Sequence, residues 1–345
     1  MRRLAAREDT DMSNPVVAEV VRGERVESAH RGAGAVVDAG GRIVMAFGDV
    51  ERPVYSHSAI KALQALPLIE SGAADRLGLS EREIALACAS HSGEDDHVAL
   101  ASAMLAKAGR DESVLECGAH WPLGEAAARA LARAGRKPGP LHNNCSGKHA
   151  GFVCLACAVG IDPRGYVAPD HPVQRRVTEA IQDVTGAKLG EETRGVDGCS
   201  IPVYAIPLRA LAHGFARFAT GRGLSPERAK AAARIRAAVA RHPAIVAGAG
   251  RFDTEVMTVL GARAFTKAGA EGVFCAALPE VGLGLAVKAD DGAARAAQVM
   301  IAALIRRFCG FDDDLRARLA PFISTGLTNW NGFEVAVLRP AGPLA

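Results

Sequence analysis

Aromatic side chains are scarce in this sequence, at 5% of 345 residues, with two Trp and three Tyr. A groove for nucleic acid needs basic residues interleaved with aromatic rings on which the bases can stack. The basic residues are instead scattered, one of the denser groups lies at 129–137, and the formal net charge is only +3. We therefore expect no nucleic-acid partner.

Long hydrophobic runs are also missing. No stretch of 18 or more apolar residues occurs, so the sequence predicts no membrane-spanning helix. Residues 1–13 contain basic side chains but lack the apolar segment that follows them in a signal peptide. We therefore expect a cytoplasmic protein that does not contact the membrane.

The eight cysteines do not form the dense framework of a small disulfide-rich domain. They are spread through a long chain, mostly among apolar or small residues, and we expect most to be reduced. Cys154 and Cys157 have C-x-x-C spacing, but their neighbours are apolar and no second pair follows at zinc-finger distance. We interpret both as buried core thiols.

Strand-like segments occur at both ends of the chain. Segments 15–23 and 32–49 are β-rich, the middle is mostly helical, and strand signals return at 262–290 and 332–340. This order predicts an α+β fold with a mainly antiparallel sheet of N- and C-terminal strands packed against helices. We expect a flexible tail at 1–13 and a single domain of two packed lobes at 14–340.

A Ser-x-x-Lys pair opens the first helical pattern. This pattern covers 58–75, and Pro67 should bend or end the helix because proline lacks an amide donor. Ser58 and Lys61 are three residues apart, so their side chains share one helix face. A neutral lysine can activate a serine as nucleophile, although such pairs also occur by chance on solvated helix surfaces.

Two later residues favour the catalytic interpretation. Ser90 ends an apolar run just before a polar, Gly-containing stretch, and Lys267 lies on a predicted strand. Acyl-serine enzymes carry S-x-x-K, then a second serine, then a lysine on a late strand, in this order. Taken singly, Ser90 is equally consistent with a loop hydroxyl and Lys267 with a solvated strand lysine. The ordered set indicates an acyl-serine enzyme.

Six ordered motifs resemble the rhizobial-type L-asparaginases, the thermolabile or inducible enzymes. They are "SAIKALQALPLIESGAAD", "CASHSGE", "HNNCSGKHAGF", "VDGCSIPVYAIPL", "GRFDTEVM" and "TKAGAEGVFCAALPE". The likeness runs from about Asn14 to Leu338. It implies a serine-hydrolase fold similar to penicillin-binding enzymes, serine β-lactamases and glutaminases. It also implies a homodimer and asparagine catabolism by hydrolysis of L-asparagine to L-aspartate and ammonia.

By this resemblance, Ser58 and Lys61 match the family's nucleophile pair, and Ser90 and Lys267 match its second Ser-Lys pair. We expect Ser58 to form an acyl-enzyme while neutral Lys61 takes its proton. The charge of Lys267 should lower the pKa of Lys61, and Ser90 should pass protons between the pairs. No organic cofactor is expected. His57 precedes the nucleophile, where the resemblance leads us to expect arginine.

The same resemblance implies a zinc site. Cys145 and Cys199 lie in polar, Gly-containing loops, and the family joins them with a lysine and an aspartate, here Lys148 and Asp197. A lysine ligand must be neutral, so metal and burial would have to depress its pKa. Catalytic and structural roles for zinc both stay open, as do a redox-sensitive role and two unconnected reduced cysteines.

Two further residues are candidates for substrate binding. His149 is placed to orient a substrate carboxylate, unless it is bonded to backbone at a helix N-terminus. Arg251 is able to meet a carboxylate, and Asp253 is expected to cap the helix that follows it.

Two rival functions share part of this pattern. A penicillin-interacting or β-lactamase-like acyl-serine hydrolase would keep S-x-x-K but act on other amides. A non-enzymatic, zinc-stabilised regulatory module would keep Cys145 and Cys199 but would not need both Ser-Lys pairs.

Overall fold

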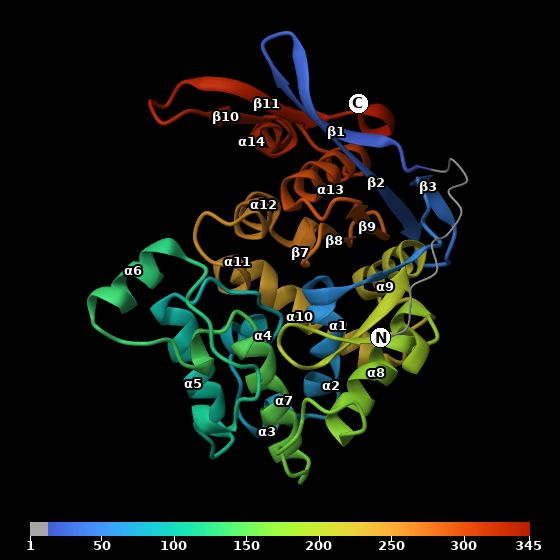
Figure 1. Ribbon diagram of the computed structural model, residues 1–345. Helices are drawn as coiled ribbons and strands as arrows, with labels where there is room; N and C mark the ends of the chain where they lie inside the picture. Colours follow the sequence, from blue (N-terminus) through green and yellow to red (C-terminus); the bar gives the residue numbers. More distant parts are fainter. Residues whose placement is uncertain (1–12) are drawn as a thin grey trace, which may run out of the picture.

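The computed structural model describes residues 13–345, so almost all of the tail expected at 1–13 lies outside the described residues. An antiparallel sheet runs in the order β10-β11-β1-β2-β9-β8-β7, and β3 pairs with β2 (Figure 1). Its strands are β1 (Val16–Arg22), β2 (Arg25–Asp38), β3 (Ile43–Phe47), β7 (Phe265–Ala268), β8 (Val273–Leu278), β9 (Leu283–Ala289), β10 (Thr325–Thr328) and β11 (Glu334–Pro340). Strands from both ends of the chain thus complete one sheet, which confirms the α+β prediction.

Helices cover both faces of this sheet. β8 is wholly buried and β9 almost wholly, as strands covered on both faces should be. α9 (Leu208–Thr220) packs on one face and α13 (Ala294–Phe308) on the other (Figure 1). A Cβ added at Gly284 would lie 2.0 Å from the Ala212 carbonyl oxygen, so β9 approaches α9 closely because it carries glycine there.

The remaining helices form most of the lower half of the molecule in Figure 1, while α12 and α14 lie above them. They are α1 (Lys61–Gln64), α2 (Leu66–Glu70), α3 (Ala73–Arg76), α4 (Glu81–Ala87), α5 (Asp95–Lys107), α6 (Glu125–Arg133), α7 (Ser146–Ala158), α8 (Pro172–Thr185), α10 (Pro226–Arg241), α11 (Pro243–Val246), α12 (Phe252–Leu260) and α14 (Asp313–Ile323).

The segment 58–75, predicted to be helical with a bend or an end at Pro67, is divided into short helical turns. It begins with the 3-10 helix η1 (His57–Ile60), continues as α1, and breaks at Ala65 before Pro67, which lies in the first turn of α2. Proline fits the first turn because the amide it lacks has no partner there. Ser58 and Lys61 therefore lie at the junction of η1 and α1.

A second, three-stranded sheet brings distant segments to η1. It runs in the order β4 (Pro53–Tyr55), β6 (Pro202–Pro207) and β5 (Arg194–Val196). β4 leads directly into η1, and the turn between β5 and β6 carries Asp197 and Cys199. Within residues 13–345, no helix combines the length and hydrophobicity that a membrane crossing requires.

Candidate active site

Ser90 lies between two buried lysine amines. Its Oγ is 2.9 Å from Lys61 Nζ and 3.0 Å from Lys267 Nζ, and both lysines are fully buried. The remaining partners of the two amines are backbone carbonyl oxygens, those of Ala89 and Ala268 among them. Three residues predicted from separate motifs thus meet at one hydroxyl.

Burial lowers the pKa of both lysines. For Lys267 the pKa falls to about 7, because burial outweighs the opposing charge of Asp253. The pKa of Lys61 is also lowered, mainly by burial, which outweighs the opposing charge of Cys145, and the charge of Lys148 adds to the lowering. The expected contribution of Lys267 to this positive field stays a prediction. Burial thus shifts both amines toward the neutral state that a general base requires.

Ser58 is half-buried, one turn before Lys61. The Lys61 backbone amide donates to the Ser58 carbonyl oxygen, but the Lys61 amine contacts Ser90 rather than the Ser58 hydroxyl. β7 lies against this turn, since a Cβ added at Gly269 would be 3.2 Å from the Ala59 nitrogen. Ser58 therefore lies one turn before a lysine of the Ser90 cluster, and its hydroxyl is not hydrogen-bonded to that lysine.

The four residues of the expected zinc site form a second cluster. Lys148 Nζ donates to Cys199 Sγ at 3.0 Å, and Cys199 Sγ lies 3.3 Å from Asp197 Oδ2. Cys145 is buried in the same cluster, where Cys199 and Lys148 act on the pKa of its thiol. His57 Nδ1 is 3.0 Å from Asp197 Oδ1, so the histidine found in place of the expected arginine anchors this carboxylate. His57 also has a φ of 42°, a strained conformation for a residue other than glycine.

In this cluster, burial and the neighbouring charges shift the pKa of Lys148 in opposite directions. Burial lowers the pKa of Lys148, but Cys145, Cys199 and Asp197 together raise it above its usual range. The neighbouring Cys199 thiol and the charge of Lys148 lower the pKa of the Cys145 thiol. Two thiols and a carboxylate are donors that suit zinc, and Lys148 supplies the fourth donor atom. Within residues 13–345, however, no three His, Cys, Asp or Glu residues are arranged so that they could hold a metal ion, and the zinc site stays a prediction.

His149 is fully buried on α7, the helix that also carries Lys148. The Tyr166 hydroxyl accepts from the Glu116 amide and lies 2.6 Å from His149 Nδ1. The hydroxyl therefore donates to Nδ1, so Nε2 carries the proton, yet Nε2 has no partner among the described residues. His149 thus offers an unused N–H donor, and the backbone bond considered for it is not formed.

Arg251 is partly buried and is itself the N-cap of α12. Asp253 was expected as this N-cap, and that prediction is wrong. Its carboxylate instead accepts hydrogen bonds from Thr266 Oγ1 at 3.0 Å and from the Ala268 amide at 3.3 Å. Asp253 therefore holds the two neighbours of Lys267 on β7.

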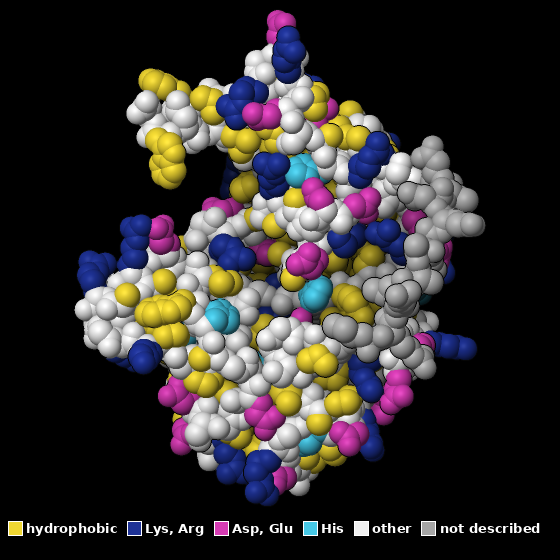
Figure 2. Space-filling view, in the orientation of Figure 1, with side chains coloured by type: hydrophobic (Ala, Val, Ile, Leu, Met, Phe, Trp, Pro, Cys, Tyr) yellow, Lys and Arg dark blue, Asp and Glu magenta, His cyan; other side chains and the backbone are white. Residues whose placement is uncertain are grey.

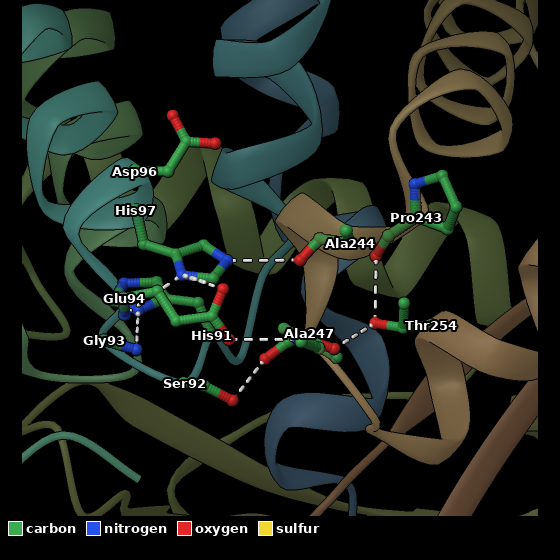
Figure 3. Close-up of polar contacts among 12 residues, drawn as sticks. His91, Ser92, Gly93, Glu94, Asp96, His97, Pro243, Ala244, Ala247 and Thr254 are labelled. Carbon is green, nitrogen blue, oxygen red and sulfur yellow. Dashed lines mark hydrogen bonds and ion pairs between the residues drawn. The ribbon is translucent and has the colours of Figure 1, made fainter. Parts of the chain in front are cut away.

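A buried polar network that was not predicted from the sequence lies beside Ser90. His91 and His97, both drawn in Figure 3, stack with ring centroids 4.9 Å apart. His91 Nε2 lies 2.9 Å from Ser146 Oγ. These histidines carry no recognisable spacing motif, and their partners come from distant segments.

On the face drawn in Figure 2, charges of both signs are intermixed without a broad basic patch.

Comparisons with known proteins identify the family of this chain. A family model described as L-asparaginase II matches residues 18–340. No curated protein matches the sequence. Among solved structures, a β-lactamase from Mycobacterium bovis is 16% identical with a TM-score of 0.44, over 81% of this chain and 95% of that one. A mutant simvastatin synthase from Aspergillus terreus is 14% identical with a TM-score of 0.39, over 75% and 86%. Because the family model spans most of the chain, the protein belongs to the L-asparaginase II family of amidohydrolases.

Proposed function

We propose that the protein hydrolyses L-asparagine to L-aspartate and ammonia through an acyl-enzyme on Ser58. The observation that carries the proposal is the meeting of Ser90 with two buried lysine amines beside Ser58. Amines that favour the neutral state are bases near neutral pH, and a serine needs such a base to become a nucleophile.

The reaction begins when the Ser58 oxygen attacks the carbonyl carbon of the substrate's side-chain amide. Lys61 accepts the Ser58 proton, and the Ser90 hydroxyl relays a proton between Lys61 and Lys267 and onto the leaving nitrogen. The carbon–nitrogen bond breaks and ammonia departs. Water then attacks the ester carbon while a lysine takes its proton. The bond between that carbon and the Ser58 oxygen breaks, the Ser58 oxygen takes up a proton to restore the hydroxyl, and L-aspartate is released. In this mechanism the Ser58 hydroxyl turns toward Lys61 when substrate binds, as hydrogen bonds at active sites often tighten only in the complex.

Substrate recognition in this proposal uses donors near the cluster. The free Nε2–H of His149 donates to the α-carboxylate, and the guanidinium of Arg251 adds a positive charge. The backbone amide of Ser58 contributes to the oxyanion hole, where a developing negative charge is stabilised by fixed N–H donors.

The proposal includes a zinc ion held by Cys145, Lys148, Asp197 and Cys199. Thiol and carboxylate donors suit this metal, and the Cys199 thiol already contacts Lys148 and Asp197. Bound zinc would tie the turn after β5 to the start of α7. The proposal also includes a homodimer in the cytoplasm.

The experiment measures ammonia release from asparagine and from glutamine, together with turnover of a chromogenic β-lactam. Ser58→Ala should lower kcat on asparagine by at least about 10⁴-fold, because the nucleophile is lost. Ser56→Ala is the matched control, since Ser56 is a buried serine two residues away whose hydroxyl bonds to the Tyr204 carbonyl. Full activity in Ser58→Ala would overturn the nucleophile assignment, and β-lactam turnover without ammonia release would favour the rival hydrolase.

A further inference from the structure

Segment 243–254 runs from α11 into the first turn of α12 and lies beside the chain that follows Ser90. Its carbonyl oxygens accept three hydrogen bonds from residues 90–97, and Figure 3 shows those from Ser92 and His97. The Ser90 amide donates to Val246 at 2.9 Å, and Ser92 Oγ donates to Ala247 at 2.8 Å. His97 Nε2 lies 3.2 Å from the Ala244 carbonyl oxygen.

The same segment also holds the strand of Lys267. Asp253, near the end of the segment, accepts from Thr266 Oγ1 and from the Ala268 amide, which are the two residues that flank Lys267 on β7. Ser90 and Lys267 are 177 positions apart in the sequence, yet their side chains lie 3.0 Å apart. Both are therefore attached to one short piece of chain.

Segment 243–254 has an internal hydrogen bond, a further bond to Glu94 and a close contact with Ser92. Thr254 Oγ1 donates to the Gly248 carbonyl at 2.7 Å, and the Ala249 amide donates to Glu94 Oε1 at 3.0 Å. Gly248 has a φ of 117°, and a Cβ added there would lie 2.5 Å from Ser92 Oγ. Only glycine combines this conformation with so close an approach.

The cross-link through His97 has a defined direction. His97 Nδ1 accepts from the Glu94 amide at 3.2 Å, so Nε2 carries the proton and donates to Ala244. Burial lowers the pKa of His97, which keeps the ring neutral in this arrangement. The ring therefore makes one local bond and one bond to segment 243–254.

We propose that segment 243–254 is a template that sets the distance between Ser90 and Lys267, with His97 and Gly248 as its positioning residues. Neither residue touches the reacting atoms in this proposal. The kinetic consequences rest on the proposed asparaginase function, whereas the distance itself does not.

A pair of His97 variants separates the two bonds of the ring. His97→Asn keeps an acceptor for the Glu94 amide but loses the donor to Ala244, and His97→Gln retains that donor. We expect His97→Asn to lower kcat by roughly 10- to 100-fold with KM little changed, because small misplacements of catalytic groups are costly. His97→Gln should restore kcat to within a few fold of the wild type. Equal losses in both variants would overturn the role of the cross-link.

A pair of glycine variants tests the close approach. Gly248→Ala should lower kcat as His97→Asn does, because the new methyl group displaces Ser92. Gly261→Ala is the control, since Gly261 also has a positive φ, 55°, but nothing lies within 4 Å of a Cβ there. It should lower the Tm without changing kcat.

Crystal structures of the variants give a readout that does not depend on activity. The contact between Ser90 Oγ and Lys267 Nζ should be lost in His97→Asn and Gly248→Ala and kept in His97→Gln. An unchanged distance of 3.0 Å in the first two variants would overturn the template. A wild type inactive on asparagine would instead refute the proposed function, and these distances would still decide the template.

Discussion

Two regions beside η1 bury lysine amines, two in one region and one in the other, and the pKa of the buried amine is shifted in opposite directions. In the Ser90 region, Lys61 and Lys267 face a hydroxyl and backbone carbonyl oxygens, and burial lowers the pKa of both. In the thiol region, Lys148 faces Cys199 and lies near Cys145 and Asp197, and its pKa is raised.

All three lysines are buried, so burial alone does not decide their charge. At Lys61 and Lys267, burial outweighs the opposing charges of Cys145 and Asp253, whereas at Lys148 the combined charges of Cys145, Cys199 and Asp197 outweigh burial. The first arrangement provides bases, and the second, in the metal-free protein, holds a positive charge. That charge in turn helps to lower the pKa of Lys61. One buried residue type thus serves two purposes through its neighbours.

The largest expected effect is the loss of a base in the Ser90 region. Lys61→Met and Lys267→Met each remove an amine but keep most of the apolar stem. Each should lower kcat on asparagine by about 10²- to 10⁴-fold, the contribution typical of general acid–base groups. Steady-state ammonia release measures this effect. A variant with wild-type kcat would show that its amine takes no part in proton transfer.

The two regions should also differ in stability. Lys148→Met leaves the Cys145 thiolate and Asp197 buried without their cation, which should destabilise the chelator-treated protein by about 3–5 kcal/mol. Lys61→Met removes an amine whose burial is itself unfavourable, because the amine has lost its contact with water. The free energy of unfolding of this variant should therefore stay the same or rise. Urea unfolding of both variants measures the contrast. Equal destabilisation by both would mean that Lys61 is as well paired as Lys148.

The sequence predicted more of the fold than of the site's internal bonding. Strand signals at both ends of the chain were sufficient for the antiparallel sheet, because they are local and strong. The division of 58–75 into η1, α1 and α2 was only partly foreseen, since Pro67 predicts a break but not the 3-10 geometry around Ser58.

In the site, the motifs identified Ser90, Lys61 and Lys267, which the structure brings together. They did not identify the residues that hold them there. Asp253 was taken for a helix cap because its local position allows that role, yet its partners lie on β7. The bond from His97 to Ala244 likewise joins segments 147 positions apart. Such contacts depend on the completed fold, so no local pattern predicts them.

The smallest expected effect is a change in pH dependence within the Ser90 region. Lys267 has a pKa of about 7 and must be neutral to act as a base, so kcat/KM should fall below pH 7 and reach a plateau above it. The charge of Asp253 raises this pKa, so Asp253→Asn should move the acid limb to lower pH, whatever the height of its plateau. Glu255→Gln, an exposed change on the same helix, should leave the limb in place. A limb that stays fixed in Asp253→Asn would mean that another group controls the acid side, and Lys267 would then lose its role as the titrating base.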